Sequence, residues 1–293
     1  MCRARATGTS ETSQEHQRHH RSIRDITGTS ETSQGHQRHH RSIRDITGAS
    51  ETSAHPQVKM GHMTLTLLCL AAYILVVTPL VPDAVFNATS YIEKNIFRGS
   101  LGQYAYFVKF TPDECNIGLH ETTLQTALGG ISGADVRTIL GNTKPIYQGD
   151  RMVAAAPIDR TLPNRKKYKD HAEYRLLEPE NNSAIRGLLN NNVQTGCVIF
   201  FSVLSPCVGK CTNPYSPYSI ITRLGNVNLP NIHNARAFAF RIPYKTERSH
   251  PTEEQIWNSW ANMNNVMPLY RCRNQRCTNC FDNNGRRVAA CYT

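Results

Sequence analysis

From Tyr104 onward, short apolar runs of strand length alternate with segments of helical spacing. The predicted strands are Tyr104–Phe110, two runs that form a hairpin around Gln148–Asp150, Gly196–Leu204, Asn234–Tyr244 and Met267–Arg273. The run "GCVIFFSVL" at 196–204 is almost continuously apolar, which is typical of a strand buried on both faces of a sheet. Predicted helices occupy Glu114–Gly130, a segment that begins at His171, and His250–Asn265.

After the first strands, helices and strands follow one another in turn. This order predicts an α/β fold in which helices cover the faces of a sheet. The basic stretch "DRTLPNRKKYKD" (Asp159–Asp170) contains a proline and is predicted to be a loop. It leads into the helix at His171, where Ala172, Leu176 and Leu177 share one side.

The first 59 residues have no pattern of a folded domain. The segment Thr7–Ile26 recurs almost unchanged as Thr27–Ile46, and a third copy begins at Thr47. Each copy is polar, so it cannot bury enough apolar surface to offset the entropy of ordering. We predict that residues 1–59 are disordered repeats, or that they precede the natural translation start at Met60 or Met63.

An apolar run at Leu65–Val77 has the length of a signal-peptide core and is short for a membrane span. We therefore predict a signal peptide at 60–84, a folded domain at 85–293, and a secreted protein with no stable membrane span. A signal anchor is the alternative. The sequons at Asn87 and Asn181 are candidate glycosylation sites and fit a secretory route.

Secretion changes the interpretation of the ten cysteines. Cys2 and Cys69 fall in segments expected to be absent from the mature protein. In an oxidising compartment the remaining even set predicts disulfides, unless some of these thiols have another role. Six are candidates for disulfides: Cys115, Cys197, Cys272, Cys277, Cys280 and Cys291. A closed zinc site made by the last four is the alternative, because Cys277 and Cys280 have ligand spacing.

The predicted folded part is basic. From Asp83 onward it has 24 basic and 16 acidic residues, a net charge of +8. This charge favours anionic partners such as nucleic acid, acidic glycans or membrane surfaces, although a merely basic soluble protein would have the same composition.

Two short motifs together indicate a metal site. His171-Ala172-Glu173 begins a predicted helix, and "SPCVGKC" places Cys207 and Cys211 after a buried strand. Imidazole and thiolate ligands suit zinc, and a set of only three leaves the fourth tetrahedral position open to water, as in catalytic sites. The order H-x-E followed by P-C-x-x-C is the signature of zinc deaminases. Here three residues, rather than two, separate the cysteines.

With "HAEYRLL", "SPCVGKC" and this order of helices and strands, the region from about Phe86 to Thr293 resembles the secreted AID/APOBEC-like cytidine deaminases, called SNAD. The resemblance implies a three-layer α/β/α fold with a mixed sheet of about five strands. It also implies one Zn²⁺ held by His171, Cys207 and Cys211, with Glu173 carrying protons during the conversion of cytosine to uracil.

The substrate is predicted to be single-stranded DNA, single-stranded RNA or a free nucleoside. Candidate contacts are Arg165, Lys166, Lys167 and Lys169 in the basic loop, and Tyr244 after a later strand. Two alternatives stay open: a deaminase of another base, and a secreted disulfide-rich binding protein with a vestigial site. The intact Glu173 argues against the vestigial site.

Overall fold

The computed structural model describes residues 80–98, 102–142, 145–161, 165, 167–231, 235–245 and 251–293. The tandem repeats, the apolar core of the predicted signal peptide and Lys166 lie outside these ranges. Within them, no helix is both long enough and apolar enough to cross a bilayer.

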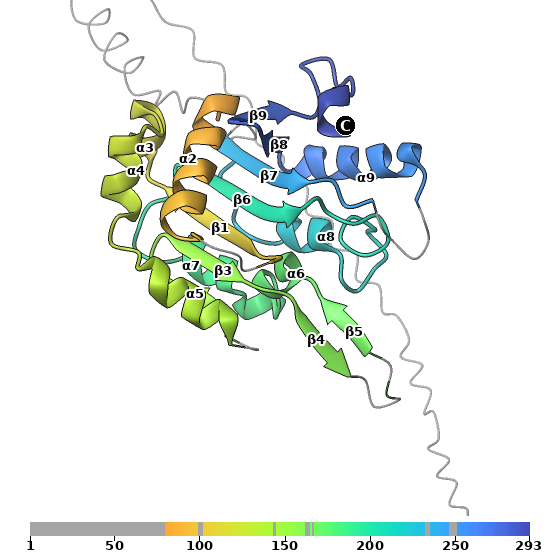
Figure 1. Ribbon diagram of the computed structural model, residues 1–293, viewed down its shortest axis with the longest axis horizontal. Helices are drawn as coiled ribbons and strands as arrows, with labels where there is room; N and C mark the ends of the chain where they lie inside the picture. Colours follow the sequence, from red (N-terminus) through yellow and green to blue (C-terminus); the bar gives the residue numbers. More distant parts are fainter. Residues whose placement is uncertain are drawn as a thin grey trace, which may run out of the picture. The chain divides into compact units, whose positions relative to one another are not determined.

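A mixed sheet lies at the centre of the described domain, with strand order β2-β3-β1-β6-β7-β8-β9 (Figure 1). The strands are β1 (Ala105–Phe110), β2 (Tyr147–Gln148), β3 (Met152–Ala155), β6 (Cys197–Leu204), β7 (Arg236–Ile242), β8 (Leu269–Arg273) and β9 (Arg276–Asn279). Strands β6, β7 and β8 are parallel, whereas β1 is antiparallel to β3 and β6, and β9 is antiparallel to β8. The predicted α/β fold is confirmed, but this sheet has seven strands within the described ranges, more than the expected five or so.

The outermost strand, β9, explains part of this difference. A two-residue turn, Asn274-Gln275, joins it to β8, and both turn residues have positive φ. Hairpin turns of this kind are usually signalled by Asn-Gly or Asp-Gly. Because no glycine marks the turn, the sequence pattern predicts only the first strand of the hairpin.

Helices cover both faces of the sheet. One face packs against α2 (Pro82–Asn95), α3 (Pro112–Ile117), α4 (Glu121–Leu128) and α5 (Gly133–Gly141). The other packs against α6 (Ala172–Leu176), α7 (Ala184–Leu189), α8 (Ile220–Gly225) and α9 (Glu253–Val266). Strand β6 lies between the two layers and is buried along nearly its whole length, as the continuous apolar run predicts. The result is a three-layer α/β/α arrangement.

Two predicted elements differ in the structure. The predicted helix at 114–130 is two helices, α3 and α4, because Gly118 adopts a φ of 101° that ends the first. The predicted basic loop at 159–170 contains an antiparallel pair, β4 (Ile158–Thr161) and β5 (Lys167–Asp170). This hairpin projects away from the main sheet (Figure 1). It has no continuous apolar face, so its sequence lacks the usual strand signal.

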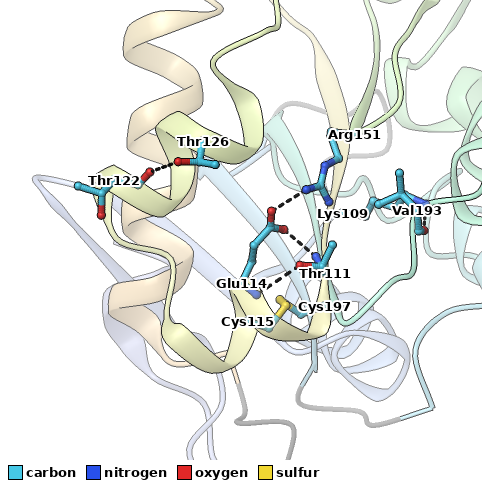
Figure 2. A network of polar contacts seen from close by, with 9 residues as sticks. All are labelled: Lys109, Thr111, Glu114, Cys115, Thr122, Thr126, Arg151, Val193 and Cys197. Carbon is cyan, nitrogen blue, oxygen red and sulfur yellow. Dashed lines mark hydrogen bonds and ion pairs between the residues drawn. A yellow bond between two sulfur atoms is a disulfide. The ribbon is translucent and has the colours of Figure 1, made fainter.

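A polar network fixes α3 beside the sheet (Figure 2). The Thr111 hydroxyl accepts a hydrogen bond from the Glu114 amide, while the Glu114 carboxylate accepts one from the Thr111 amide at 2.7 Å. This capping box satisfies amide groups in the first turn of the helix. The other Glu114 oxygen accepts a bond from Arg151 at 2.5 Å, which connects α3 to the turn before β3.

All six predicted disulfide cysteines are paired. The bonds are Cys115–Cys197, Cys272–Cys277 and Cys280–Cys291. The alternative of a closed zinc site in the C-terminal tail is therefore wrong, because every one of its four thiols is in a disulfide. Cys207 and Cys211 are the remaining cysteines of the described residues, and both are buried and reduced.

Candidate functional site

The residues of the two sequence motifs meet at one end of the sheet. His171 follows β5 directly and is the N-terminal cap of α6, with an extended backbone, so Glu173 lies in the first turn of the helix. Cys207 lies just beyond the carboxyl end of β6, and Cys211 lies on the same loop. Because β6 and β7 are parallel, their carboxyl ends share this edge, where ligands of α/β sheets commonly bind.

The three candidate ligand atoms lie close together. His171 Nδ1 is 3.3 Å from Cys211 Sγ and 3.7 Å from Cys207 Sγ, and the two sulfur atoms are 3.3 Å apart. A tetrahedral zinc with bonds of about 2.3 Å to sulfur and about 2.0 Å to nitrogen needs ligand separations of roughly 3.5–3.8 Å. The cluster therefore has the composition and nearly the dimensions of a metal site with three protein ligands.

Glu173 lies beside this cluster and is almost completely buried, with 1% of its surface exposed. Its Oε1 accepts a hydrogen bond of 2.7 Å from the hydroxyl of Ser202 on β6. Its Oε2 is buried and has no hydrogen-bond partner among the described residues. A carboxylate oxygen without a partner in such a place is suited to accept a proton or to bond a bound molecule.

The environment shifts the pKa of each group in the cluster. A hydrogen bond from Cys211 is the largest effect that lowers the pKa of Cys207, to about 4, while the pKa of Cys211 is raised well above its usual value. Burial raises the pKa of Glu173. For His171, burial lowers the pKa, but the hydrogen bond to Cys207 and the charges of Glu173 and Cys207 outweigh it, so the net shift is upward. The lowered pKa of Cys207 favours the thiolate form that binds a cation.

A cavity of about 630 Å³ opens beside the cluster. His171, Glu173 and Cys207 contribute to its wall. Three predicted substrate contacts also line it, namely Lys167, Lys169 and Tyr244. Arg165 is exposed and is not among the lining residues, and Lys166 lies outside the described ranges. The structure therefore brings together the predicted metal ligands, Glu173 and three of the five predicted contacts.

Several lining residues were not predicted from the sequence. They are Gln103, Tyr168, Leu204, Ser205, Gly209 and Lys210. Ser205 accepts a hydrogen bond of 2.9 Å from the Tyr244 amide and so joins the loop after β7 to the cysteine loop. Ser202 is not among the residues that line the cavity, but it donates a hydrogen bond to Glu173. Its one sequence signal is a hydroxyl within an otherwise apolar strand.

The comparison with protein families agrees with this arrangement. The sequence model for secreted novel AID/APOBEC-like deaminase 1 (SNAD1) matches residues 82–293, which includes every described residue except the first two. The sequence has no significant match among curated proteins, and none among solved structures. The match covers well over half of the chain, and the chain belongs to the SNAD1 family of AID/APOBEC-like deaminases.

Proposed function

We propose that this protein is a secreted, zinc-dependent deaminase that converts cytosine to uracil in a polynucleotide or a nucleoside. The observation that carries the proposal is the convergence of His171, Cys207 and Cys211 beside a buried carboxylate, at the wall of an open cavity. The family assignment supports a deaminase, and the geometry supports the roles of these residues.

His171 Nδ1 and the two cysteine sulfurs would hold the metal. When bound at such a site, Zn²⁺ lowers the pKa of water to about 7 and so supplies a nucleophile at neutral pH. The donor set fits zinc because it is soft and has three members, which leaves one position for water or substrate. The disulfides use the other described cysteines, so they do not compete for the metal.

Glu173 would move the protons. In hydrolytic deamination, water adds to the ring carbon that bears the amine, and the amine leaves as ammonia. Glu173 takes a proton from the attacking water and passes it to the adjacent ring nitrogen. It then takes the proton of the hydroxyl group formed on that carbon and transfers it to the departing amine. Oε2, which has no partner among the described residues, is the atom suited to this role.

The cavity wall supports a nucleotide substrate. Lys167, Lys169 and Lys210 add positive charge to its lining, which would attract the phosphate groups of a strand. Tyr168 and Tyr244 present aromatic rings that can stack on bases. A free nucleoside would use the inner part of the cavity alone, so the two substrate classes differ in their need for the lysines.

The test of the mechanism is Glu173→Ala. We expect this variant to fold and to retain one zinc per chain, because Glu173 is not a ligand, but to lose cytosine deamination. A general acid or base typically accelerates a reaction about 10²–10⁴-fold. Because one carboxylate serves several proton transfers here, we expect the loss of deamination rate to lie at the upper end of this range. The measurement is uracil formation from an oligonucleotide and from cytidine, with metal analysis.

Glu121→Ala is the matched control, because it removes an exposed carboxylate from α4 on the opposite face of the sheet. It should leave activity unchanged. Full activity in Glu173→Ala would exclude the mechanism. If the zinc-loaded wild type converts adenine but not cytosine, the substrate assignment fails, and if it converts no base, the binding-protein alternative replaces the enzyme.

For secretion, we propose that the signal peptide is cleaved before Leu80, earlier than the 84/85 boundary expected from the sequence. Two observations support the earlier position. Helix α2 begins at Pro82, and Tyr270 donates a hydrogen bond of 2.9 Å to the Leu80 carbonyl.

A coding sequence that begins at Met60 should yield secreted protein glycosylated at Asn87 or Asn181. N-terminal sequencing and glycosidase treatment check this, and a secreted product that retains the repeats would contradict it.

A further inference from the structure

Ser202 is the polar residue within the buried apolar strand β6, and its side chain is completely inaccessible to solvent. Its cross-strand neighbours are Ala105 on β1 and Phe240 on β7, neither of which offers a polar side chain. Burying a hydroxyl in such a place costs free energy unless the hydroxyl is hydrogen-bonded. Among the described residues, its partner is Oε1 of Glu173, at 2.7 Å.

This single bond makes the two oxygens of Glu173 unequal. Oε1 accepts the Ser202 hydroxyl, while Oε2 has no hydrogen-bond partner in the described part of the chain. The strand that carries Ser202 is held on both sides by β1 and β7, so the hydroxyl has a rigid support. The side chain of Glu173 has three rotatable bonds, and α6, with only five residues, fixes its backbone but not its carboxylate.

We infer that Ser202 is a positioning residue that anchors one oxygen of Glu173, so that the other oxygen stays directed at the reacting groups. This inference rests on the proposed function, since it assigns Glu173 as the proton carrier. A carboxylate that serves successive proton transfers must return to the same place after each of them. Small displacements of catalytic groups are costly because the reacting atoms must lie within hydrogen-bond reach.

The variant Ser202→Ala removes the anchor. We expect kcat to fall about 10- to 100-fold, the range typical when a hydrogen-bond partner next to a metal site is removed, with KM and zinc content unchanged. Ser202→Thr keeps a hydroxyl at the same place, and threonine suits a strand. It should restore kcat to within about threefold of the wild type.

Ser219→Ala is the matched control, because it also removes a buried hydroxyl. Ser219 is 1% exposed and accepts a bond from the Thr222 amide at the start of α8, without contact to Glu173. The control should lose stability but keep kcat per folded, zinc-loaded chain. An equal loss of kcat in Ser219→Ala and Ser202→Ala would reduce Ser202 to a purely structural role and overturn the inference.

Two further measurements keep the test decisive. In a Glu173→Asp variant the shorter side chain cannot keep the hydrogen bond to Ser202. Adding Ser202→Ala to that variant should therefore lower kcat by less than about threefold. If Ser202→Ala lowers kcat as much in the Glu173→Asp variant as in the wild type, the anchoring role is contradicted, even if Ser202→Thr fails to fold. A crystal structure of Ser202→Ala should show the Glu173 carboxylate displaced or in several positions. This measurement does not depend on enzymatic activity. It therefore tests whether Ser202 holds the Glu173 carboxylate in place even if the wild type proves not to be a deaminase. An unmoved carboxylate would overturn the inference.

Discussion

At the scale of single residues, the pKa values of the two cysteines in the candidate metal site shift in opposite directions. In the absence of a cation, the low pKa of Cys207 makes it a thiolate at neutral pH, while the raised pKa of Cys211 keeps that residue a thiol. One proton is therefore shared between two sulfur atoms 3.3 Å apart. A divalent cation would replace that proton and bind both sulfurs as thiolates.

This arrangement predicts that zinc binding releases protons. At pH 7 the metal must displace the proton of Cys211 and any proton on His171, whose pKa is raised. Because ligands bind zinc only when deprotonated, the affinity should rise with pH, about tenfold per unit for each proton released. Calorimetric titration of the metal-free protein in buffers of different ionisation enthalpy measures this release.

Cys207→Ser is the companion variant and should lose stoichiometric zinc together with the order of the surrounding loop. One zinc per chain in Cys207→Ser would contradict the ligand assignment. Zinc binding without proton release would contradict the protonation states described above.

At the scale of elements, the β4–β5 hairpin places charge beside the site. Lys167 and Lys169 alternate along β5 with Tyr168 and Asp170, and both lysines line the cavity. Asp170 is buried and forms an ion pair with Arg160 on β4, which holds the two strands together next to His171. The hairpin thus supports the candidate metal ligand His171 at its end and presents basic side chains along its length.

Replacing Lys167 and Lys169 by alanine should separate the two substrate classes. We expect weaker binding of a single-stranded oligonucleotide and a smaller salt dependence, with the logarithmic slope reduced by about 0.7 for each phosphate that the variant no longer neutralises. Turnover of free cytidine should stay the same. The assay is a salt series with both substrates.

Lys94→Ala removes an exposed lysine from α2, on the face of the sheet opposite to α6, and serves as the control. Equal effects of the hairpin substitutions on oligonucleotide and cytidine would indicate a nucleoside enzyme.

At the scale of the whole described domain, one of the three disulfides joins elements that are distant along the chain. Cys115 on α3 is bonded to Cys197 at the start of β6, across a sequence separation of 82 residues. The bond therefore connects one helical layer to the central strand that leads to the loop of Cys207 and Cys211. Such bonds fit the secreted character that the family name indicates.

The disulfides should contribute unequally to stability. Loop-closure entropy predicts about 4.5 kcal/mol for the separation of 82 residues in Cys115–Cys197, against about 2 kcal/mol for the separation of 5 in Cys272–Cys277. Paired substitution by alanine followed by denaturant unfolding measures both. A larger loss from the Cys272 and Cys277 pair would contradict this ranking. Zinc content measured alongside shows whether the loop of Cys207 and Cys211 stays ordered.

The sequence by itself determined the α/β class, most strands of the sheet, the paired cysteines as a set, and the motif residues of the site. These features depend on local patterns. A buried strand such as β6 must be apolar, and zinc ligands must be of particular residue types. The motif of His171, Glu173, Cys207 and Cys211 could therefore be recognised from residue types and their order along the chain, without knowledge of the distances between them.

Only the tertiary structure decided the disulfide partners, the β4–β5 and β8–β9 hairpins, and the contact between Ser202 and Glu173. Each of these depends on which segments meet in space. Ser202 and Glu173 are 29 residues apart, and nothing in either segment alone indicates the other. A hydroxyl in an apolar strand becomes informative only when packing places it against one carboxylate oxygen, because burial makes that hydrogen bond obligatory.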